Sequence, residues 1–285
     1  MFSMSRLVAY LRSRWGTTSP DPSAKTPQDD RKGRWFARVA VVFFVMAVPL
    51  FLITTNVRIV TNSGWLYSFG FANNDSVALS RIEKPELMRV ARDIKQYFNS
   101  NQEPLQVRAP DSVQSDALFD YTSEGRLFSD REVAHMADVK ALYRDVGFWQ
   151  RVTFFYITGF IIIGALLWGR RALLERLARS IVWAGVVTIL LGVAVGIGSL
   201  VGFDTLFEQY HVISFSNDLW QLDPNEYMLR IFPEGFFMDA TLIVAGMTLA
   251  QAALGATVAG GYLLLRRRPA VDAKSAEPLN LKPVH

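Results

Sequence analysis

Two histidines are the residues of this chain best suited to proton-transfer chemistry. His135 and His211 lie in separate polar and aromatic stretches, and the only other histidine is the last residue, His285. Imidazole titrates near neutral pH, so it can accept or donate a proton under physiological conditions. The chain contains no cysteine, which excludes a thiol nucleophile and disulfide bonds. We therefore expect acid–base chemistry to centre on His135 and His211.

Polar neighbours could assist each histidine. Asp138 lies three residues after His135 on the same face of a predicted helix, where it could orient the imidazole or hold it protonated. The same spacing is common on ordinary helix surfaces. His211 precedes Val212–Phe215, which alternates like a short strand and leads into a polar run. In that run Asn217 could donate to a developing oxyanion, although turn and capping roles would explain these residues as well.

Three alternatives compete with a two-histidine mechanism. Ser214 or Ser216 could be the nucleophile of a membrane lipid or ester hydrolase, but neither lies in a Gly-x-Ser-x-Gly elbow. A metal could bind His135, Asp138 and His211, but a His-x-x-Asp spacing arises easily by chance and no His-Glu-x-x-His motif is present. The chain could also be a non-enzymatic membrane interaction protein. We expect no metal and no cofactor.

Four long uncharged stretches must position these residues. Each is close to or above the roughly 18–20 residues that cross about 30 Å of hydrocarbon as a helix. Backbone polar groups in lipid must be satisfied within the segment, which favours helices. The sequence thus predicts a mainly α-helical, polytopic membrane protein with its transmembrane domain over residues 35–265. The predicted spans are Val39–Val57, Val152–Gly169, Ser180–Phe203 and Ala240–Leu265.

Basic residues predict the orientation of the spans. Most of the 30 lysines and arginines lie in the N-terminal tail, the short loop Arg170–Arg179 and the C-terminal tail. Such residues favour the cytoplasmic side, so both termini are predicted to be cytoplasmic and the loops 58–151 and 204–239 to form an extracytoplasmic cap. The tails, residues 1–34 and 266–285, are predicted to be partly disordered, and the first span to be an uncleaved anchor. The positive charge suits anionic lipid and gives no reason to expect a nucleic-acid partner.

Local patterns predict two further helices and one contact between spans. Pro85–Asn99 carries apolar residues at helical spacing. Ser129 followed three residues later by Glu132 is a capping box, which predicts a helix that begins at Asp130 and continues towards the second span. Gln251 interrupts the fourth span, where we expect it to form a hydrogen bond with another helix.

Aromatic residues follow the second histidine. Phe215, Trp220 and Phe236 suit the level of the lipid headgroups, where one side of a ring is wet and the other is oily. Residues of this kind anchor proteins at the membrane interface. They could equally line a groove for an acyl chain, and the sequence does not separate these two roles.

Two segments together carry the motifs of a known family. The segments are Phe128–Lys140 and His211–Trp220, and the second continues through residues 222–224 and 232–234. They resemble the two signatures of the bacterial lipoprotein intramolecular transacylases. The resemblance covers about Trp35–Leu265 and includes the four-span layout. It therefore implies a four-helix membrane enzyme with its site on the extracytoplasmic face of the bacterial plasma membrane.

The resemblance also implies a reaction. The family moves the sn-2 acyl chain of a lipoprotein's S-diacylglyceryl group onto the α-amine of the same N-terminal cysteine, and its two motif histidines correspond to His135 and His211. Diacylated lipoproteins and membrane lipids are the implied partners. One imidazole could take the proton of the amine while the other protonates the departing glycerol oxygen. Our working hypothesis makes His135 the base and His211 the acid or the stabiliser of the tetrahedral intermediate, with Asp138 and Asn217 in support.

Overall fold

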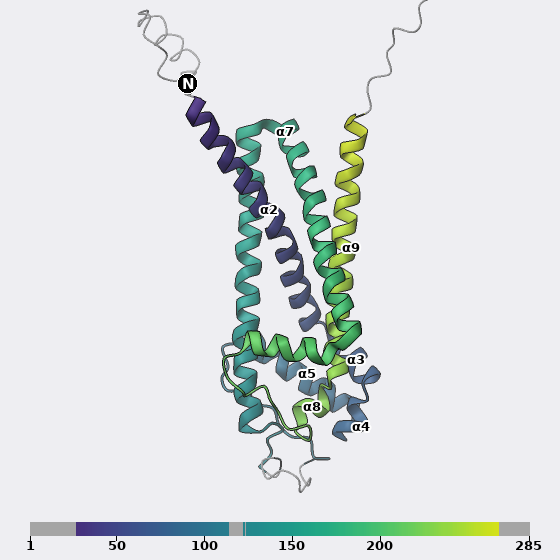
Figure 1. Cartoon of the computed structure of the whole chain (residues 1–285). Helices are drawn as coiled ribbons and strands as arrows, with labels where there is room; N and C mark the ends of the chain where they lie inside the picture. The colour runs from purple at the N-terminus through teal and green to yellow at the C-terminus, as the bar shows by residue number, and fades with distance from the viewer. Residues whose placement is uncertain (1–26, 114–121, 123, 268–285) are drawn as a thin grey trace, which may run out of the picture. The chain divides into compact units, whose positions relative to one another are not determined.

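The computed structural model describes residues 27–113, 122 and 124–267, and this part of the chain is mainly α-helical (Figure 1). Within it the only extended pairing is an isolated antiparallel bridge between Arg108 and Arg126. The predicted mainly α-helical class is confirmed. The helices are α2 (Pro27–Asn62), α3 (Gly64–Asn73), α4 (Ser76–Ser80), α5 (Lys84–Phe98), α7 (Asp130–Ser214), α8 (Tyr227–Ile231) and α9 (Glu234–Arg267).

Contacts divide the chain into two compact units, residues 1–42 and residues 43–285. Of the first unit, the structure describes only the beginning of α2. Helix α2 begins at Pro27, within the predicted tail over residues 1–34. The rest of that tail and residues 268–285 lie outside the described residues. The side-chain contacts discussed below all belong to the second unit.

Three of the described helices are long and apolar enough to cross a membrane, judged by length and composition: α2, α7 and α9. Helix α7 has 85 residues, several times the roughly 20 that one crossing needs. Its backbone leaves the helical conformation at Gly169 (φ 71°, ψ 161°) and again at Gly202 (φ −172°, ψ 77°). The positive φ at Gly169 is one that glycine adopts without steric cost. At Gly169 the chain reverses direction, so α7 contains both of the middle predicted spans (Figure 1).

The loop predicted over residues 170–179 is helical instead. Gly169 alone makes the reversal, so the helix can resume at the next residue. Side chains then hold the two arms together near the turn. Leu173 packs closely on Gly164, since a Cβ added to Gly164 would lie 2.8 Å from the Leu173 side chain. The Arg176 guanidinium lies 4.6 Å from the centre of the Trp168 ring. The basic residues of this turn therefore lie on a helix.

Polar side chains connect the long helices. The Asn56 amide of α2 donates to Thr248 and Gln251 of α9, each at 2.9 Å, and the Gln251 amide donates back at 3.2 Å. The predicted bond of Gln251 to another helix is confirmed. Helices α7 and α9 also approach closely, since a Cβ on Gly185 would lie 2.8 Å from that of Ala256. Such small residues let transmembrane helices pack tightly.

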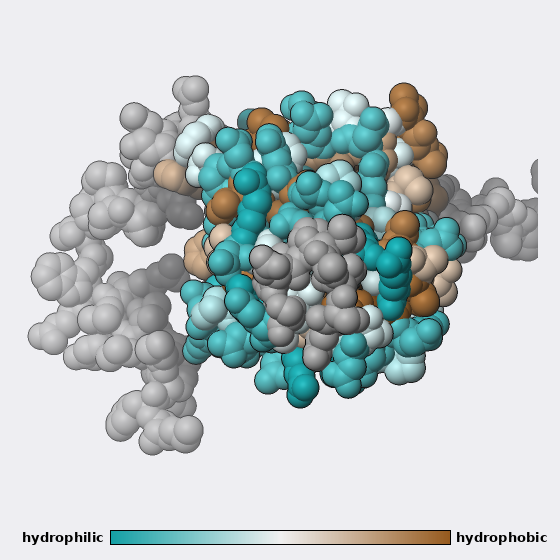
Figure 2. Space-filling model, turned by 90° about the horizontal axis from the view of Figure 1, so that it is seen from below, coloured by the Kyte–Doolittle hydropathy of each residue, from teal (hydrophilic) through white to brown (hydrophobic). Residues whose placement is uncertain are grey.

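The short helices α3, α4, α5 and α8 gather at one end of the long helices and enclose a hydrophobic core (Figure 1). Helix α5 confirms the periodicity predicted for Pro85–Asn99, because its stripe Leu87, Val90, Ala91 and Ile94 is buried. Seen from this end, the surface is mostly hydrophilic with scattered hydrophobic residues (Figure 2). These short helices therefore form a folded region with its own core, at the end where α7 begins and ends (Figure 1).

Candidate active site

The first turn of α7 places His135. The Ser129 hydroxyl accepts the Glu132 N–H at 3.2 Å, and the Glu132 carboxylate accepts the Ser129 N–H at 2.6 Å. This is the predicted capping box, and the helix begins at Asp130 as predicted. Capping satisfies backbone donors that a helix terminus would otherwise leave unpaired. The helix carries His135 into the interior, where 8% of the residue's surface is exposed.

The last part of α7 places His211. After the break at Gly202, the helix runs crosswise to the long helices and ends where the Phe215 N–H donates to the His211 carbonyl at 2.9 Å (Figure 1). The strand predicted for Val212–Phe215 is wrong, because residues up to Ser214 continue this helix. Its alternating pattern reflects an exposed, partly apolar helix end. His211 itself is 7% exposed.

The two imidazoles meet although 75 residues of helix separate them in the chain. Their ring centres lie 6.0 Å apart, with 36° between the ring planes. The break at Gly169 returns α7 to its starting end, and the break at Gly202 turns its last segment across that end. The structure therefore brings together the two histidines that the sequence singled out.

Aromatic rings surround the histidine pair. Phe215 lies edge-on to His135 at 5.3 Å and 5.6 Å from His211, while Trp220 lies 5.2 Å from His211 with 32° between the planes. Phe207 is closest, at 4.3 Å from His211. No sequence pattern singled out Phe207, because it lies just beyond the third predicted span and contacts His211 one turn along the helix.

Phe236, the third aromatic residue predicted for an acyl-chain groove, lies elsewhere. It is buried in the core of the short helices, against Phe71 and Phe232. A Cβ on Gly70 would overlap its ring, so Phe236 fills the space that this glycine leaves. Phe236 therefore packs the core, whereas Phe215 and Trp220 adjoin the histidines.

The hydrogen bond of His211 defines its tautomer. Nδ1 lies 2.7 Å from the Phe207 carbonyl oxygen. A carbonyl only accepts, so Nδ1 carries the proton and the neutral ring presents its lone pair at Nε2. His135 differs, since its buried Nδ1 has no hydrogen-bond partner among the described residues. The two rings are thus unequal: one is oriented by the backbone and the other has an uncommitted nitrogen.

Both imidazoles are neutral at pH 7. Burial, and to a smaller extent the neighbouring His211, lowers the pKa of His135 from 6.5 to about 4, against an opposing effect of Asp138. Burial also lowers the pKa of His211, against the bond to the Phe207 carbonyl, which raises it. Desolvation disfavours the charged form of imidazole, which accounts for both directions.

The predicted supporting residues bind each other. The Asn217 amide donates to the Asp138 carboxylate at 2.9 Å, and the Asn217 carbonyl oxygen accepts the Leu219 N–H at 3.0 Å. Next to them, the Arg131 guanidinium donates to the Asp218 carbonyl at 2.5 Å. Asp138 acts on His135 through its charge, and Asn217 is an exposed loop residue. Their geometry fits attachment of the loop after His211 to the helix that carries His135.

Neither predicted serine is placed as a nucleophile. Ser214 shares a hydrogen bond with the Tyr210 hydroxyl, and Ser216 is exposed. His211 directs its Nδ1 to the Phe207 carbonyl, not to either serine. The described residues also contain no cluster of three His, Asp or Glu side chains suited to a metal ion.

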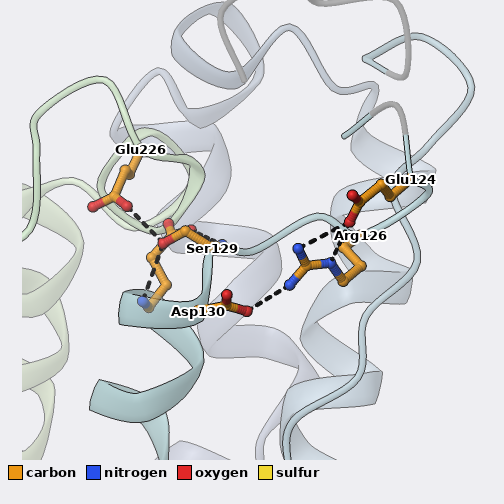
Figure 3. A network of polar contacts seen from close by, with 6 residues as sticks. Glu124, Arg126, Ser129, Asp130 and Glu226 are labelled. Carbon is orange, nitrogen blue, oxygen red and sulfur yellow. Dashed lines mark hydrogen bonds and ion pairs between the residues drawn. The ribbon is translucent and has the colours of Figure 1, made fainter. Parts of the chain in front are cut away.

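A buried carboxylate network lies one turn from His135, and only its capping role is visible in the sequence. The Glu132 carboxylate accepts the Met228 N–H at 2.6 Å in addition to the Ser129 N–H. The Ser129 hydroxyl donates to Glu226 at 2.6 Å, whereas exposed Arg126 bridges Glu124 and Asp130 nearby (Figure 3). Burial raises the pKa of Glu132 to about 7, against the hydrogen bonds from Ser129 and Met228.

Known proteins resemble this chain in sequence. The model of a family described as lipoprotein intramolecular transacylase Lit matches residues 42–237, a range that contains both histidines. A protein of Aquifex aeolicus described as uncharacterized is 30% identical over 120 residues, and the match spans 42% of this chain and half of that relative.

Solved structures have a similar fold. The membrane integral lipoprotein intramolecular transacylase Lit from Bacillus cereus is 20% identical, with a TM-score of 0.62 over 81% of this chain and 97% of that one. A variant of the same protein with one histidine replaced by alanine is 18% identical, with a TM-score of 0.63 over 83% and 98% of the two chains. At this identity the likeness concerns the fold.

Proposed function

The chain belongs to the lipoprotein intramolecular transacylase family, and we propose that it moves the sn-2 acyl chain of an S-diacylglyceryl lipoprotein onto the α-amine of the same N-terminal cysteine. The observation that carries the mechanism is the contact of two buried, neutral imidazoles, 6.0 Å apart. No serine or thiol needs to form a covalent intermediate, because the substrate contains both the nucleophile and the ester.

The fold supports the predicted arrangement in a membrane. We propose four crossings, made by α2, the two arms of α7 around Gly169, and α9, with the short helices as an extracytoplasmic cap. The basic turn after Gly169 and both termini would then be cytoplasmic, in the bacterial plasma membrane. The crosswise segment of α7 would lie at the outer interface, where an S-diacylglyceryl group also lies.

The low pKa of His135 changes how the amine must be activated. An α-amine has a pKa near 8, so transfer of its ammonium proton to a base of pKa about 4 is uphill by about 5 kcal/mol. The amine therefore reacts in its neutral form, which a desolvated site also favours. As the amine nitrogen bonds to the acyl carbon, it becomes strongly acidic. One of the two imidazoles then takes the proton that the amine nitrogen loses.

We assign the base role to His211, which reverses our working hypothesis. Its Nδ1–H is held by the Phe207 carbonyl, so Nε2 is a fixed acceptor and the bond makes the ring more basic. The proton taken from the amine can then pass to the departing glycerol oxygen as the acyl C–O bond breaks. His135 stays neutral beside the protonated His211, and its N–H can stabilise the tetrahedral oxyanion.

The substrate's own geometry makes positioning important. The amine reaches the ester through a ring of about eight atoms with many free rotations, so holding one conformation can contribute several kcal/mol. In this family the nucleophilic amine and the leaving glycerol oxygen belong to the same molecule. The acyl chain can therefore pass directly between them without a covalent bond to the enzyme.

Mass spectrometry of a lipoprotein N-terminus tests the activity. Cells that express the chain should convert S-diacylglyceryl cysteine into an N-acyl, S-monoacylglyceryl form, and cells that lack it should not. A free α-amine that persists despite normal membrane expression would contradict the proposed function.

The pH behaviour of the histidines follows from their burial. In a His285→Ala background, NMR of labelled imidazoles should show both remaining rings less than half protonated at pH 6.5, because desolvation lowers both pKa values. His135 should remain neutral until the pH approaches about 4. A ring that is half protonated at pH 6.5 or above would show that the pair is not desolvated.

A further inference from the structure

The proposed chemistry leaves one selectivity unexplained. Water and the α-amine can attack the same acyl carbon, and an imidazole that accepts a proton from the amine can equally accept one from water. Attack by water would form a bond from its oxygen to the acyl carbon and break the acyl C–O bond. One water proton would pass to the glycerol oxygen, and a free fatty acid would leave. The two histidines alone therefore do not decide between transfer and hydrolysis.

Two aromatic side chains cover the histidine pair. Phe215 contacts both imidazoles, at 5.3 Å and 5.6 Å between ring centres, and Trp220 lies 5.2 Å from His211 with the two ring planes tilted by 32°. Both aromatic residues are themselves half-buried, whereas both histidines are buried. Phe215 and Trp220 are thus partly exposed rings that pack against the buried imidazoles.

The loop that carries these rings is tightly held. The Gln221 N–H donates to the Asp218 carbonyl at 3.1 Å and the Leu222 N–H to the Trp220 carbonyl at 2.9 Å, which makes successive turns around Trp220. The Arg131 guanidinium and Asp138 bind the same loop from α7. The position of the indole is therefore set by bonds on both sides of it.

We propose that Trp220 and Phe215 are specificity-determining residues that keep water from the acyl carbon, so that the site transfers the chain instead of hydrolysing the ester. This inference rests on the proposed function. It agrees with the burial of both histidines, which lowers the pKa of each imidazole. Closing a site against water is a recognised way to suppress hydrolysis of a reactive group.

The test measures how the ester partitions between two products. Purified protein in detergent micelles would receive a synthetic S-diacylglyceryl lipopeptide in ¹⁸O-water, and mass spectrometry would quantify N-acyl lipopeptide and ¹⁸O-labelled fatty acid. Trp220→Ala and Phe215→Ala should each raise the ratio of fatty acid to N-acyl product about tenfold or more. Trp220→Phe, which keeps a ring over His211, should retain a lower ratio than Trp220→Ala.

Matched variants separate this role from a structural one. Trp183→Ala removes an indole that is 62% exposed, away from the histidines, and should leave the ratio unchanged. If the alanine variants do not fold, Phe215→Leu gives the same comparison with a smaller opening. Slower reaction at an unchanged product ratio would overturn the inference. A wild-type protein that makes no N-acyl product would instead contradict the proposed function itself.

Discussion

Replacing either His135 or His211 by alanine should lower the rate of N-acylation by about 100-fold to 10,000-fold, the range that general acid–base groups contribute. The expected loss is large for both because the two rings have different roles. In the proposed mechanism, His211 takes and returns the proton, and His135 stabilises the oxyanion. Rates would be measured with the purified variants and a diacyl lipopeptide by mass spectrometry of its N-terminus.

His285→Ala is the matched control for these two variants. It removes the chain's only other histidine, in the C-terminal tail, and should leave the rate unchanged. Because His135 and His211 are buried, unfolding midpoints of each variant would accompany the rates. A folded His135→Ala or His211→Ala variant that retained a rate close to wild type would exclude the acid–base pair.

Replacing Glu132 by alanine should destabilise the protein, and more so at pH 5 than at pH 8. The change leaves the buried N–H groups of Ser129 and Met228 without their acceptor, at about 1–3 kcal/mol each. The pH effect follows from the pKa of Glu132, which folding raises from 4.5 to about 7. Between these values the folded state binds more protons than the unfolded state, so wild-type stability falls as pH rises.

The expected size of this effect can be stated for each pH. At pH 5 we expect a loss of about 2–5 kcal/mol in the free energy of unfolding. At pH 8 the loss should be about 2–3 kcal/mol smaller, because alanine also removes the cost of ionising a buried carboxyl. Denaturant unfolding in detergent micelles at the two pH values would measure both.

Glu124→Ala provides the comparison for Glu132→Ala. Glu124 is an exposed carboxylate that pairs with Arg126 at 3.0 Å, and such surface pairs contribute about 0–1 kcal/mol. The free energy of unfolding that Glu124→Ala removes should therefore be small at both pH values. If Glu132→Ala also caused only a small loss of stability, the Glu132 carboxylate would not hold the segment at Met228 to the first turn of α7.

Local sequence patterns predicted the elements that depend on neighbouring residues. The capping box of Ser129 and Glu132 predicted the start of α7, and the apolar stripe of residues 85–99 predicted α5. Gln251 was expected to bind another helix, because an amide in a long apolar stretch requires a partner. Each of these inferences needed only sequence spacing and one physical rule.

The arrangement of the site depends on features that spacing does not encode. The break at Gly202 turns the last segment of α7 across the end of the long helices. The sequence does not show which of the several glycines in this stretch breaks the helix. The bond from Met228 to Glu132 joins residues 96 positions apart. The strand predicted at Val212–Phe215 was wrong for the same reason: alternation over four residues also suits one exposed helix turn. Tertiary packing decides such short patterns.

The most direct test of a transfer without a covalent enzyme intermediate is a crossover experiment. Two lipopeptides, one with isotope-labelled acyl chains and one with an isotope-labelled peptide, would be mixed with the purified protein and analysed by mass spectrometry. We predict N-acyl products in which every labelled chain remains on its original peptide. Labelled acyl chains on the other peptide, or on the protein itself, would contradict direct transfer between the amine and ester held beside His135 and His211.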